Sequence, residues 1–251
     1  TSWRMVAEHC ELFVSFGSLR LNNAQVTYGG QGPHHTREWV ETAATNGVSF
    51  LNIGPIRDDQ AAEANGRWQP IRPGTDVALM LGLMHTLVGD GLADLDFLDR
   101  YCTGWEQLEA YVLGTVDGQP KSSAWAAEIT GIEAASIEAL AREMASKRTT
   151  INLSLSVQRA DHGEQSYWMA FALGCVLGQM GLPGGGVSYP FGAQGNSGAG
   201  QVRKRVPGLP VPPQASGMPV ISVSRVTELL EGPGRTMSFN GRDTELPDIK
   251  L

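Results

Sequence analysis

The sequence predicts an α/β fold: a Rossmann-like parallel sheet flanked by helices, with a helical insertion and a long Gly/Pro-rich loop. Short apolar runs alternate with helical segments over residues 11–89, which is typical of parallel strands with helices on the faces. A further buried strand is expected at 149–157, after a mainly helical section at 90–147. We expect residues 1–251 to form one internal domain cut from a larger protein.

The first part of the chain supplies three expected strands, each a short apolar run that ends near glycine or proline. The helices between them end at Asn46-Gly47 and at Gly66, residue types that favour helix termination. In order, the expected elements are a strand at 11–16, a loop at 19–33, a helix at 36–45, a strand at 48–53, a short helix at 58–65, an extended piece at 68–71 and a helix at 76–89.

The second part combines a helical section, one central strand and a long loop. Residues 149–157 carry almost no charge, so this strand is expected at the centre of the sheet. Residues 187–218 are rich in Gly, Pro and Gln, and long loops in compact domains are usually functional or disordered. The expected elements are helices at 94–101, 105–113, 122–130 and 133–145, the strand at 149–157, a helix at 162–180, a helix toward the end of 220–230 and a small hairpin around 236–241.

The composition excludes several classes of function. Hydrophobic residues make up 41% of the chain and charged residues 18%, with a formal net charge of −7. No basic field is present to neutralise phosphates, so we expect no nucleic-acid partner. The longest apolar run, residues 77–84, is too short for a membrane span. Cys10, Cys102 and Cys175 form no CxxC pair, so we expect this chain to hold no metal through cysteine.

Three loops are expected at one edge of the sheet, because ligands of open α/β sheets bind beyond the carboxyl ends of the strands. They are residues 17–23, 54–57 and 72–76. In the last of them, Pro73-Gly74 makes a tight approach to a helix that is apolar nearly all round and is therefore expected to be buried. Thr75 and Asp76 can cap its N–H groups. Asp76 is either a cap alone or a cap that also accepts from a donor-rich ligand such as a guanine edge.

Four segments carry motifs in the order and at the spacing of one known family. They are residues 76–88, Asp96-Phe-Leu-Asp-Arg-Tyr101 with Gly104-Trp105, Val157-Gln-Arg-Ala-Asp-His-Gly-Glu164, and Leu177-Gly-Gln-Met-Gly-Leu-Pro-Gly-Gly-Gly186. Together they closely resemble the dimethyl sulfoxide reductase family of molybdopterin enzymes. The nearest branch is that of the dimethyl sulfoxide, trimethylamine N-oxide and biotin sulfoxide reductases, which Asn240-Gly241 and Pro247-Asp-Ile-Lys250 also fit.

The resemblance implies a cofactor that the chain shares with parts outside it. Family members are much longer and hold molybdenum through two molybdopterin guanine dinucleotides, with a serine from an upstream segment as a metal ligand. We therefore expect the cofactor in the full-length enzyme only, and expect the fragment alone to lack it and to be inactive. The implied partners are an S-oxide or N-oxide substrate and an electron donor. The implied compartment is the periplasm, with the cytoplasm as the alternative.

The resemblance also implies where the nucleotide tail binds. Gly17, Ser18, Asn22 and Asn23 would approach the phosphates or the pterin, although Asn22 and Asn23 are equally well explained as turn formers. Ser156, Gln158 and Arg159 would lie near the pterin and the metal, and Arg159 could direct its charge at an oxo-substrate. The remaining implied residues are Asn52, Gly54, Pro55, Ile56 and Arg57 on the ribose and guanine side, and Gly74, Thr75 and Asp76 at the guanine.

Some residues depart from the family pattern or allow a simpler interpretation. Gly54 stands where members often have an acid, Leu19-Arg20 where many have Asn-Pro or Asp-Pro, and Leu155 where related reductases often have tryptophan. This leaves the substrate open. Gln158-Arg159 could instead be a strand end that pairs with Asp161 or Glu164.

Two other function classes remain as alternatives. A nicotinamide-type dehydrogenase domain is disfavoured, because Phe16-Gly-Ser-Leu-Arg-Leu follows the first strand in place of GxGxxG. A non-catalytic interaction module would need only the acidic surface and the long loop.

Overall fold

The computed structural model describes residues 1–26, 34–199, 221–239 and 241–249. These group into two compact units, residues 1–202 and 203–251, and each unit is described by itself. The prediction of one internal domain over 1–251 is not decided by this grouping and stays a prediction. Within the described ranges no helix is long and apolar enough to cross a membrane.

The first unit contains the parallel sheet that the sequence predicts. Its strands lie in the order β3-β2-β1-β4-β5 and every neighbouring pair is parallel, so the predicted α/β fold class is confirmed. The strands are β1 (Leu12–Phe16), β2 (Ser49–Ile53), β3 (Arg67–Gln69), β4 (Thr149–Leu153) and β5 (Gly186–Ser188).

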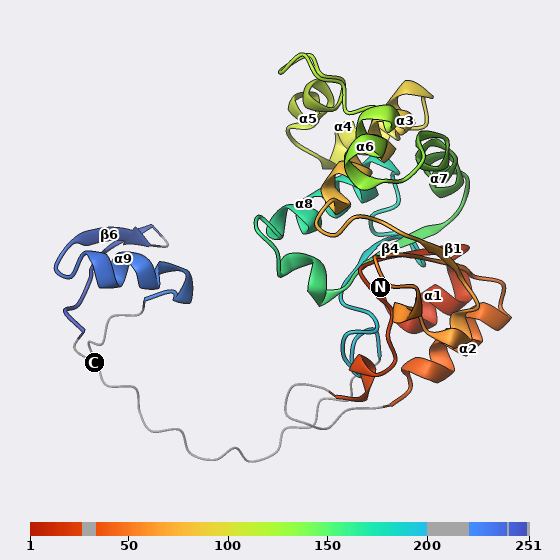
Figure 1. Cartoon of the computed structure of the whole chain (residues 1–251), viewed down its shortest axis with the longest axis horizontal. Helices are drawn as coiled ribbons and strands as arrows, with labels where there is room; N and C mark the ends of the chain where they lie inside the picture. The colour runs from red at the N-terminus through yellow and green to blue at the C-terminus, as the bar shows by residue number, and fades with distance from the viewer. Residues whose placement is uncertain (27–33, 200–220, 240, 250–251) are drawn as a thin grey trace. The chain divides into compact units, whose positions relative to one another are not determined.

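Helices cover both faces of this sheet. Figure 1 shows α3 to α7 gathered on one side of the strands, with α1 and α2 on the other. The helices are α1 (Trp3–His9), α2 (Thr36–Thr45), α3 (Asp76–Gly89), α4 (Leu95–Tyr101), α5 (Trp105–Val112), α6 (Ser123–Thr130), α7 (Ala134–Ser146) and α8 (Glu164–Val176).

Two apolar cores lie on the two faces. The larger joins Val14, Leu51 and Ile151 to side chains of α3, α7 and α8. The smaller joins Phe13 and Phe50 to α1 and α2, and successive strand residues face opposite cores because side chains alternate along a strand.

The structure differs from the local predictions of the sequence in several places. Helix α1 was not expected, and residues 58–65 form two short 3₁₀ turns, η2 (Arg57–Asp59) and η3 (Ala62–Ala64), instead of one helix. The strand expected at 149–157 ends at Leu153, because the Ser154 hydroxyl accepts from the Ser156 N–H and starts a 3₁₀ turn, η4 (Leu155–Gln158).

The expected loop at 187–218 is also wrong at its start. Residues 187 and 188 belong to β5, an edge strand of the sheet. Residues 200–218 of that loop lie outside the described residues.

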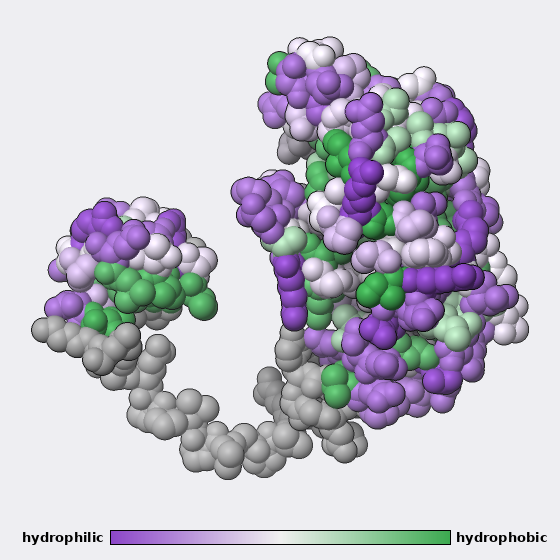
Figure 2. Space-filling model, in the orientation of Figure 1, coloured by the Kyte–Doolittle hydropathy of each residue, from purple (hydrophilic) through white to green (hydrophobic). Residues whose placement is uncertain are grey.

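The second unit is small. It contains a 3₁₀ turn, η5 (Val223–Arg225), the short helix α9 (Val226–Glu231), and a hairpin of β6 (Thr236–Phe239) and β7 (Arg242–Glu245). The hairpin confirms the one predicted around 236–241. Figure 2 shows a hydrophobic patch on the visible face of this unit. Val223, Val226 and Leu230 of η5 and α9 are exposed apolar residues of the same unit.

Candidate functional site

The loops that follow the strands start level with one another. Phe16 pairs with Ile53 on one side and with Leu153 on the other. The backbone continues this alignment beyond the strands, because the Gly17 N–H donates to the Ile53 carbonyl (2.9 Å) and the Ser154 N–H to the Phe16 carbonyl (2.9 Å). The loops after β1, β2 and β4 therefore leave the sheet at a common edge, which agrees with the prediction for the first two of these loops.

Gly17 lets the β1 and β4 loops approach closely. Its φ is +100°, which side-chain-bearing residues rarely adopt. A Cβ at this position would lie 2.1 Å from Ser154 Oγ and 2.9 Å from Ser156 Oγ. Glycine is thus required by both the backbone angle and the neighbouring hydroxyls.

A cavity of about 290 Å³ opens beside this contact. The Ser154 and Ser156 hydroxyls hydrogen-bond to each other at its wall. From α8, the Tyr167 hydroxyl donates to the Ser154 carbonyl (2.9 Å) and steadies the same loop. The cavity is lined by Ser18, Asn23, Val26, Ser154, Leu155, Ser156, Arg159 and Ala193.

This lining brings together Ser18, Asn23, Ser156 and Arg159 of the predicted site. It also adds residues that the sequence argument missed. Ser154 follows a strand as part of a Ser-x-Ser pair, a signal that could have been used. Ala193 comes from the segment after β5, and Val26 from the β1 loop; neither carries a motif.

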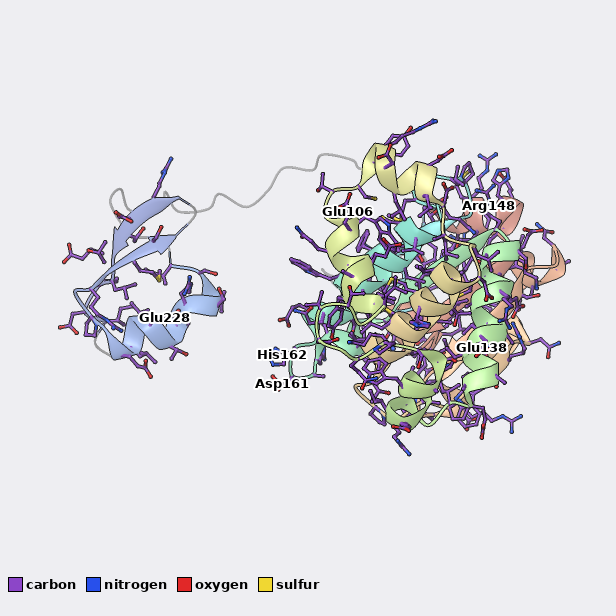
Figure 3. All side chains as sticks on the ribbon, turned by 90° about the horizontal axis from the view of Figure 1, so that it is seen from above. Glu106, Glu138, Arg148, Asp161, His162 and Glu228 are labelled. Carbon is purple, nitrogen blue, oxygen red and sulfur yellow. The ribbon has the colours of Figure 1, made fainter. Side chains whose placement is uncertain are left out.

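Arg159 is exposed at the cavity, and its guanidinium makes no ion pair with Asp161 or Glu164 among the described residues. That simpler interpretation is therefore not supported. Asp161 and His162 instead project away from the body of the unit (Figure 3), with 3.8 Å between the Asp161 carboxylate and the His162 Nε2. His162 has a φ of +53°, so the turn between β4 and α8 is tightly bent there. Gln158 is exposed and does not line the cavity.

The β1 and β2 loops are fastened to each other. The Leu19 N–H donates to the Asp59 carbonyl (2.9 Å), and the Arg20 guanidinium pairs with the Asp59 carboxylate (3.1 Å). Asn22 follows at the start of a 3₁₀ turn, η1 (Asn23–Gln25), where its side chain makes no capping bond. Asn22 is exposed and lies outside the cavity lining.

Asn52 occupies a polar row that crosses the sheet one residue before the edge. Ser15 pairs with Asn52 on one side and Asn152 on the other. The Asn152 amide donates to Ser15 Oγ (3.0 Å), and its Oδ1 accepts from the Phe191 N–H (3.0 Å). The Asn52 side chain is 1% exposed, yet neither its oxygen nor its nitrogen has a partner among the described residues. An unsatisfied buried amide is rare and indicates a missing hydrogen-bonding group nearby.

The β2 loop becomes open to solvent after Gly54. Gly54 itself is buried, and its carbonyl accepts from the Trp68 indole N–H (2.8 Å). Pro55, Ile56 and Arg57 are exposed. Their backbone thus extends the edge from the β1 loop toward β3.

The turn at residues 72–76 is anchored to the carboxyl end of α6 by Arg72. The Arg72 guanidinium donates to the carbonyls of Glu128 (2.6 Å) and Ile129 (3.2 Å) at the carboxyl end of that helix. Gly74 has a φ of +77° and open space around its Cα. The predicted cap at Thr75 is wrong, because its hydroxyl donates back to the Arg72 carbonyl (2.7 Å).

Asp76 is the first residue of α3 and is buried, with 8% of its surface exposed. Burial raises the pKa of this carboxyl, and a hydrogen bond from its own backbone N–H opposes that rise. The described residues offer it no cation. A carboxylate held this way has unused acceptor capacity, which favours the cap-plus-acceptor interpretation over the cap alone.

The predicted residues therefore form a line and not one pocket. The cavity lies over β4 and β1, Asn52 and Gly54 lie at β2, and Asp76 follows β3. With about 4.8 Å between neighbouring strands, the line is roughly 15 Å long and suits an extended ligand. Among the described residues, no group of three His, Cys, Asp or Glu side chains could hold a metal ion.

Comparison with known proteins gives a consistent result. A family model described as molybdopterin oxidoreductase matches residues 2–230. Biotin sulfoxide reductase of Cereibacter sphaeroides is 40% identical over 98% of this chain and 33% of its own length. Dimethyl sulfoxide/trimethylamine N-oxide reductase of Rhodobacter capsulatus is 36% identical over 100% of this chain and 32% of its own length.

The chain thus spans about a third of the length of these curated relatives. Among solved structures, acetylene hydratase from Pelobacter acetylenicus matches with a TM-score of 0.56 and 21% identity, over 71% of this chain and 24% of that one. This last likeness concerns the fold alone.

Proposed function

Because the chain belongs to the molybdopterin oxidoreductase family, we propose that it is the part of a longer S-oxide or N-oxide reductase that holds the guanine dinucleotide tail of a molybdopterin cofactor. The observation that carries the proposal is Asp76, a buried carboxylate that has no cation among the described residues and lies at the end of a line of open loops. When bound, the molybdenum cofactor supplies oxygen atom transfer from the oxide substrate.

The residues along the sheet edge have separate roles in this proposal. Asp76 accepts from the two donors on the guanine edge, N1–H and N2–H, a two-point contact that neutral acceptors match poorly. Gly74 leaves open space for the base to approach. The exposed loop at residues 55–57 and the buried Asn52 border the ribose.

The cavity over β4 and β1 suits the other end of the cofactor. Gly17 permits the close backbone approach that an anion needs, and Ser18, Asn23 and Ser156 offer hydrogen-bond donors to phosphate or pterin. Arg159, an exposed residue of the cavity lining, would offer positive charge to the oxide oxygen of a substrate bound there. Gln158 borders the pterin.

The names of the relatives support the substrate class. They are reductases of biotin sulfoxide, dimethyl sulfoxide and trimethylamine N-oxide, which share a polar oxide oxygen on sulfur or nitrogen. We propose the same class for the longer protein, with a separate electron donor. We further propose a periplasmic location, which rests on the family resemblance alone and which cell fractionation would test.

The experiment that tests the role is the cofactor content of the full-length protein. We expect molybdenum and, after acid hydrolysis, guanosine monophosphate in purified protein from molybdate-fed cells. The Asp76→Asn variant should contain less of both, because an amide NH₂ replaces one acceptor oxygen and opposes the guanine donors. Equal guanosine monophosphate in parent and variant would remove Asp76 from the site. If the folded parent contains neither molybdenum nor the nucleotide, the proposed function is refuted.

A further inference from the structure

Two tyrosine side chains meet beside the cavity loop, which we define as residues 154–163. Tyr167 lies at the end of the first turn of α8, and Tyr189 directly follows β5. Their ring centroids are 5.2 Å apart, with an angle of 82° between the ring planes. This edge-to-face arrangement is one that aromatic rings prefer. The two rings therefore pack against each other and join α8 to the end of the sheet.

The backbone on both sides of Tyr189 is fixed to β4. Ser188, the residue before it, pairs with Asn152. Two residues after it, the Phe191 N–H donates to Asn152 Oδ1 (3.0 Å) and the Phe191 carbonyl accepts from Asn152 Nδ2 (3.2 Å). Phe191 is itself buried in the smaller core. Because its backbone is held to a central strand, the Tyr189 ring is a firm support for Tyr167.

The cavity loop makes few bonds to the body of the unit. Among the described residues, the hydrogen bonds of residues 155–162 join only positions within 154–166. Val157 packs against the larger core, which holds the loop in place but does not set the directions of its polar groups. Figure 3 shows Asp161 and His162, near the far end of the loop, pointing away from the unit. The polar groups of the loop therefore need a further support.

Tyr167 supplies that support at the start of the loop. Its hydroxyl donates to the Ser154 carbonyl (2.9 Å) and so fixes the peptide unit that leads into η4. The Ser154 hydroxyl in turn bonds to the Ser156 hydroxyl on the cavity wall. Burial and the neighbouring Tyr189 side chain raise the pKa of Tyr167, so its hydroxyl keeps the proton that it donates throughout the neutral range.

We propose that Tyr167, supported by Tyr189, is a positioning residue for the reduction of the oxide substrate. It holds the cavity loop so that the Ser156 hydroxyl and the Arg159 guanidinium keep their directions at the cavity. This inference rests on the proposed function, in which the cavity holds cofactor and Arg159 offers charge to the oxide oxygen. Tyr167 does not line the cavity, so its effect passes through the loop.

The main test is Tyr167→Phe in the full-length protein, which removes the hydroxyl and keeps the ring against Tyr189. Rates are measured with reduced methyl viologen and whichever of dimethyl sulfoxide, trimethylamine N-oxide or biotin sulfoxide the parent reduces fastest, and are divided by molybdenum content. We expect KM for the oxide to rise roughly three- to tenfold, the effect of one lost hydrogen bond, with kcat unchanged. The matched control is Tyr101→Phe, since Tyr101 is exposed and its hydroxyl makes no hydrogen bond with the described residues.

A double variant tests whether the effect passes through Arg159. Arg159→Ala alone should raise KM, because the charge at the cavity is lost. Adding Tyr167→Phe to Arg159→Ala should raise KM no further, whereas two independent sites would multiply their effects. Multiplied effects would overturn the positioning role, and so would a Tyr167→Phe variant that loses molybdenum but keeps the KM of the parent.

Tyr189→Leu tests the supporting ring. It removes the edge-to-face contact and leaves the Tyr167 hydroxyl in place, so KM should rise in the same direction as in Tyr167→Phe. A KM equal to that of the parent would remove Tyr189 from the proposal.

Hydrogen–deuterium exchange gives a readout that needs no activity. In full-length Tyr167→Phe, we expect faster exchange in the peptides that cover residues 154–163 and exchange like that of the parent over residues 76–89. Unchanged exchange at 154–163 would overturn the proposal. If the folded parent holds no molybdenum, the proposed function fails, and exchange still decides whether Tyr167 holds the loop. Molybdenum and turnover in the parent, with an unchanged KM in Tyr167→Phe, would keep the proposed function and overturn this inference.

Discussion

At the scale of single residues, Gly17 offers the sharpest test of the site's geometry. Its matched control is Gly47, which has a similar φ of +93° but no atom near its missing Cβ. We expect Gly47→Ala to cost about 1 kcal/mol from backbone strain alone. Gly17→Ala should cost roughly 1–3 kcal/mol more, because its Cβ would collide with the Ser154 hydroxyl.

Urea unfolding of both variants measures the difference. Equal losses would mean that the Gly17–Ser154 contact is loose enough to give way. The cavity beside it would then not require glycine.

The pH dependence of the free energy of unfolding distinguishes the two interpretations of Asp76, a helix cap alone or a cap that also accepts from a ligand. Because burial raises its pKa above the ordinary value of 3.8, the folded state binds this proton more tightly than the unfolded state. Its contribution to the free energy of unfolding therefore falls as pH rises from the ordinary pKa through the raised one. In cofactor-free full-length protein, we expect Asp76→Asn to remove that fall and to be at least as stable as the parent at neutral pH.

The measurement is urea unfolding between about pH 4 and pH 7. Asp96→Asn is the control, since Asp96 is an exposed acid in the first turn of α4. A clear loss of stability in cofactor-free Asp76→Asn at neutral pH, together with the parent's molybdenum content when the variant is purified from molybdate-fed cells, would favour the cap alone.

At the scale of elements, the turn that presents Asp76 depends on a neighbouring helix. Arg72 satisfies two carbonyls at the end of α6, and positive charge at a helix carboxyl end is favourable. We expect Arg72→Met to lower the free energy of unfolding by about 1 kcal/mol and to weaken cofactor retention, because the 72–76 turn loses its support.

The control is Arg100→Met. Arg100 is in the last turn of α4, and its side chain makes no hydrogen bond or ion pair with the described residues. Calorimetry and molybdenum content are the two measurements. Loss of stability without loss of molybdenum would limit Arg72 to a structural role.

Comparison of predicted and observed elements shows which patterns are informative. Helices at 36–45 and 76–89 were predicted with the observed bounds, because each is framed by turn residues and has a clear apolar pattern. β5 was missed because three residues after a run of glycines carry no periodicity. The strand at 149–157 was drawn too long because Ser154 ends it through a local hydrogen bond from the Ser156 N–H, which competes with the sheet and which the Ser-x-Ser pair could have indicated.

The candidate site likewise has a part that could be predicted from the sequence and a part that could not. The loops at the sheet edge and the carboxylate at Asp76 could be named from the sequence, since strand order and helix starts place them. The contact between Gly17 and Ser154 and the unpaired amide of Asn52 could not. Both depend on which residues of β1, β2 and β4 are paired across the sheet, and that pairing is a tertiary property.

At the scale of the whole molecule, the candidate site residues form an open line along the sheet edge. This arrangement implies that the cofactor is bound jointly by this chain and by parts of the protein outside it. The line extends over roughly 15 Å by strand spacing, and Asp76 is the buried acceptor that we place at its guanine end. A long ligand that contacts protein on one side only has little of its surface buried. Burial of most of the ligand's surface is what normally gives small-molecule sites their affinity. We therefore expect the chain of 251 residues, expressed alone, to retain no molybdenum cofactor through purification and to reduce no S-oxide or N-oxide.

The measurement is reduced methyl viologen consumption with dimethyl sulfoxide, trimethylamine N-oxide or biotin sulfoxide as acceptor, compared with the full-length protein at equal molar concentration. Turnover by the chain alone would contradict the shared site. If cofactor is retained without turnover, the grip along the sheet edge suffices for binding and the parts outside the chain are needed only for the chemistry. Addition of the remaining polypeptide in trans should then restore activity, because the cavity and the Asp76 turn would already be occupied in the correct orientation.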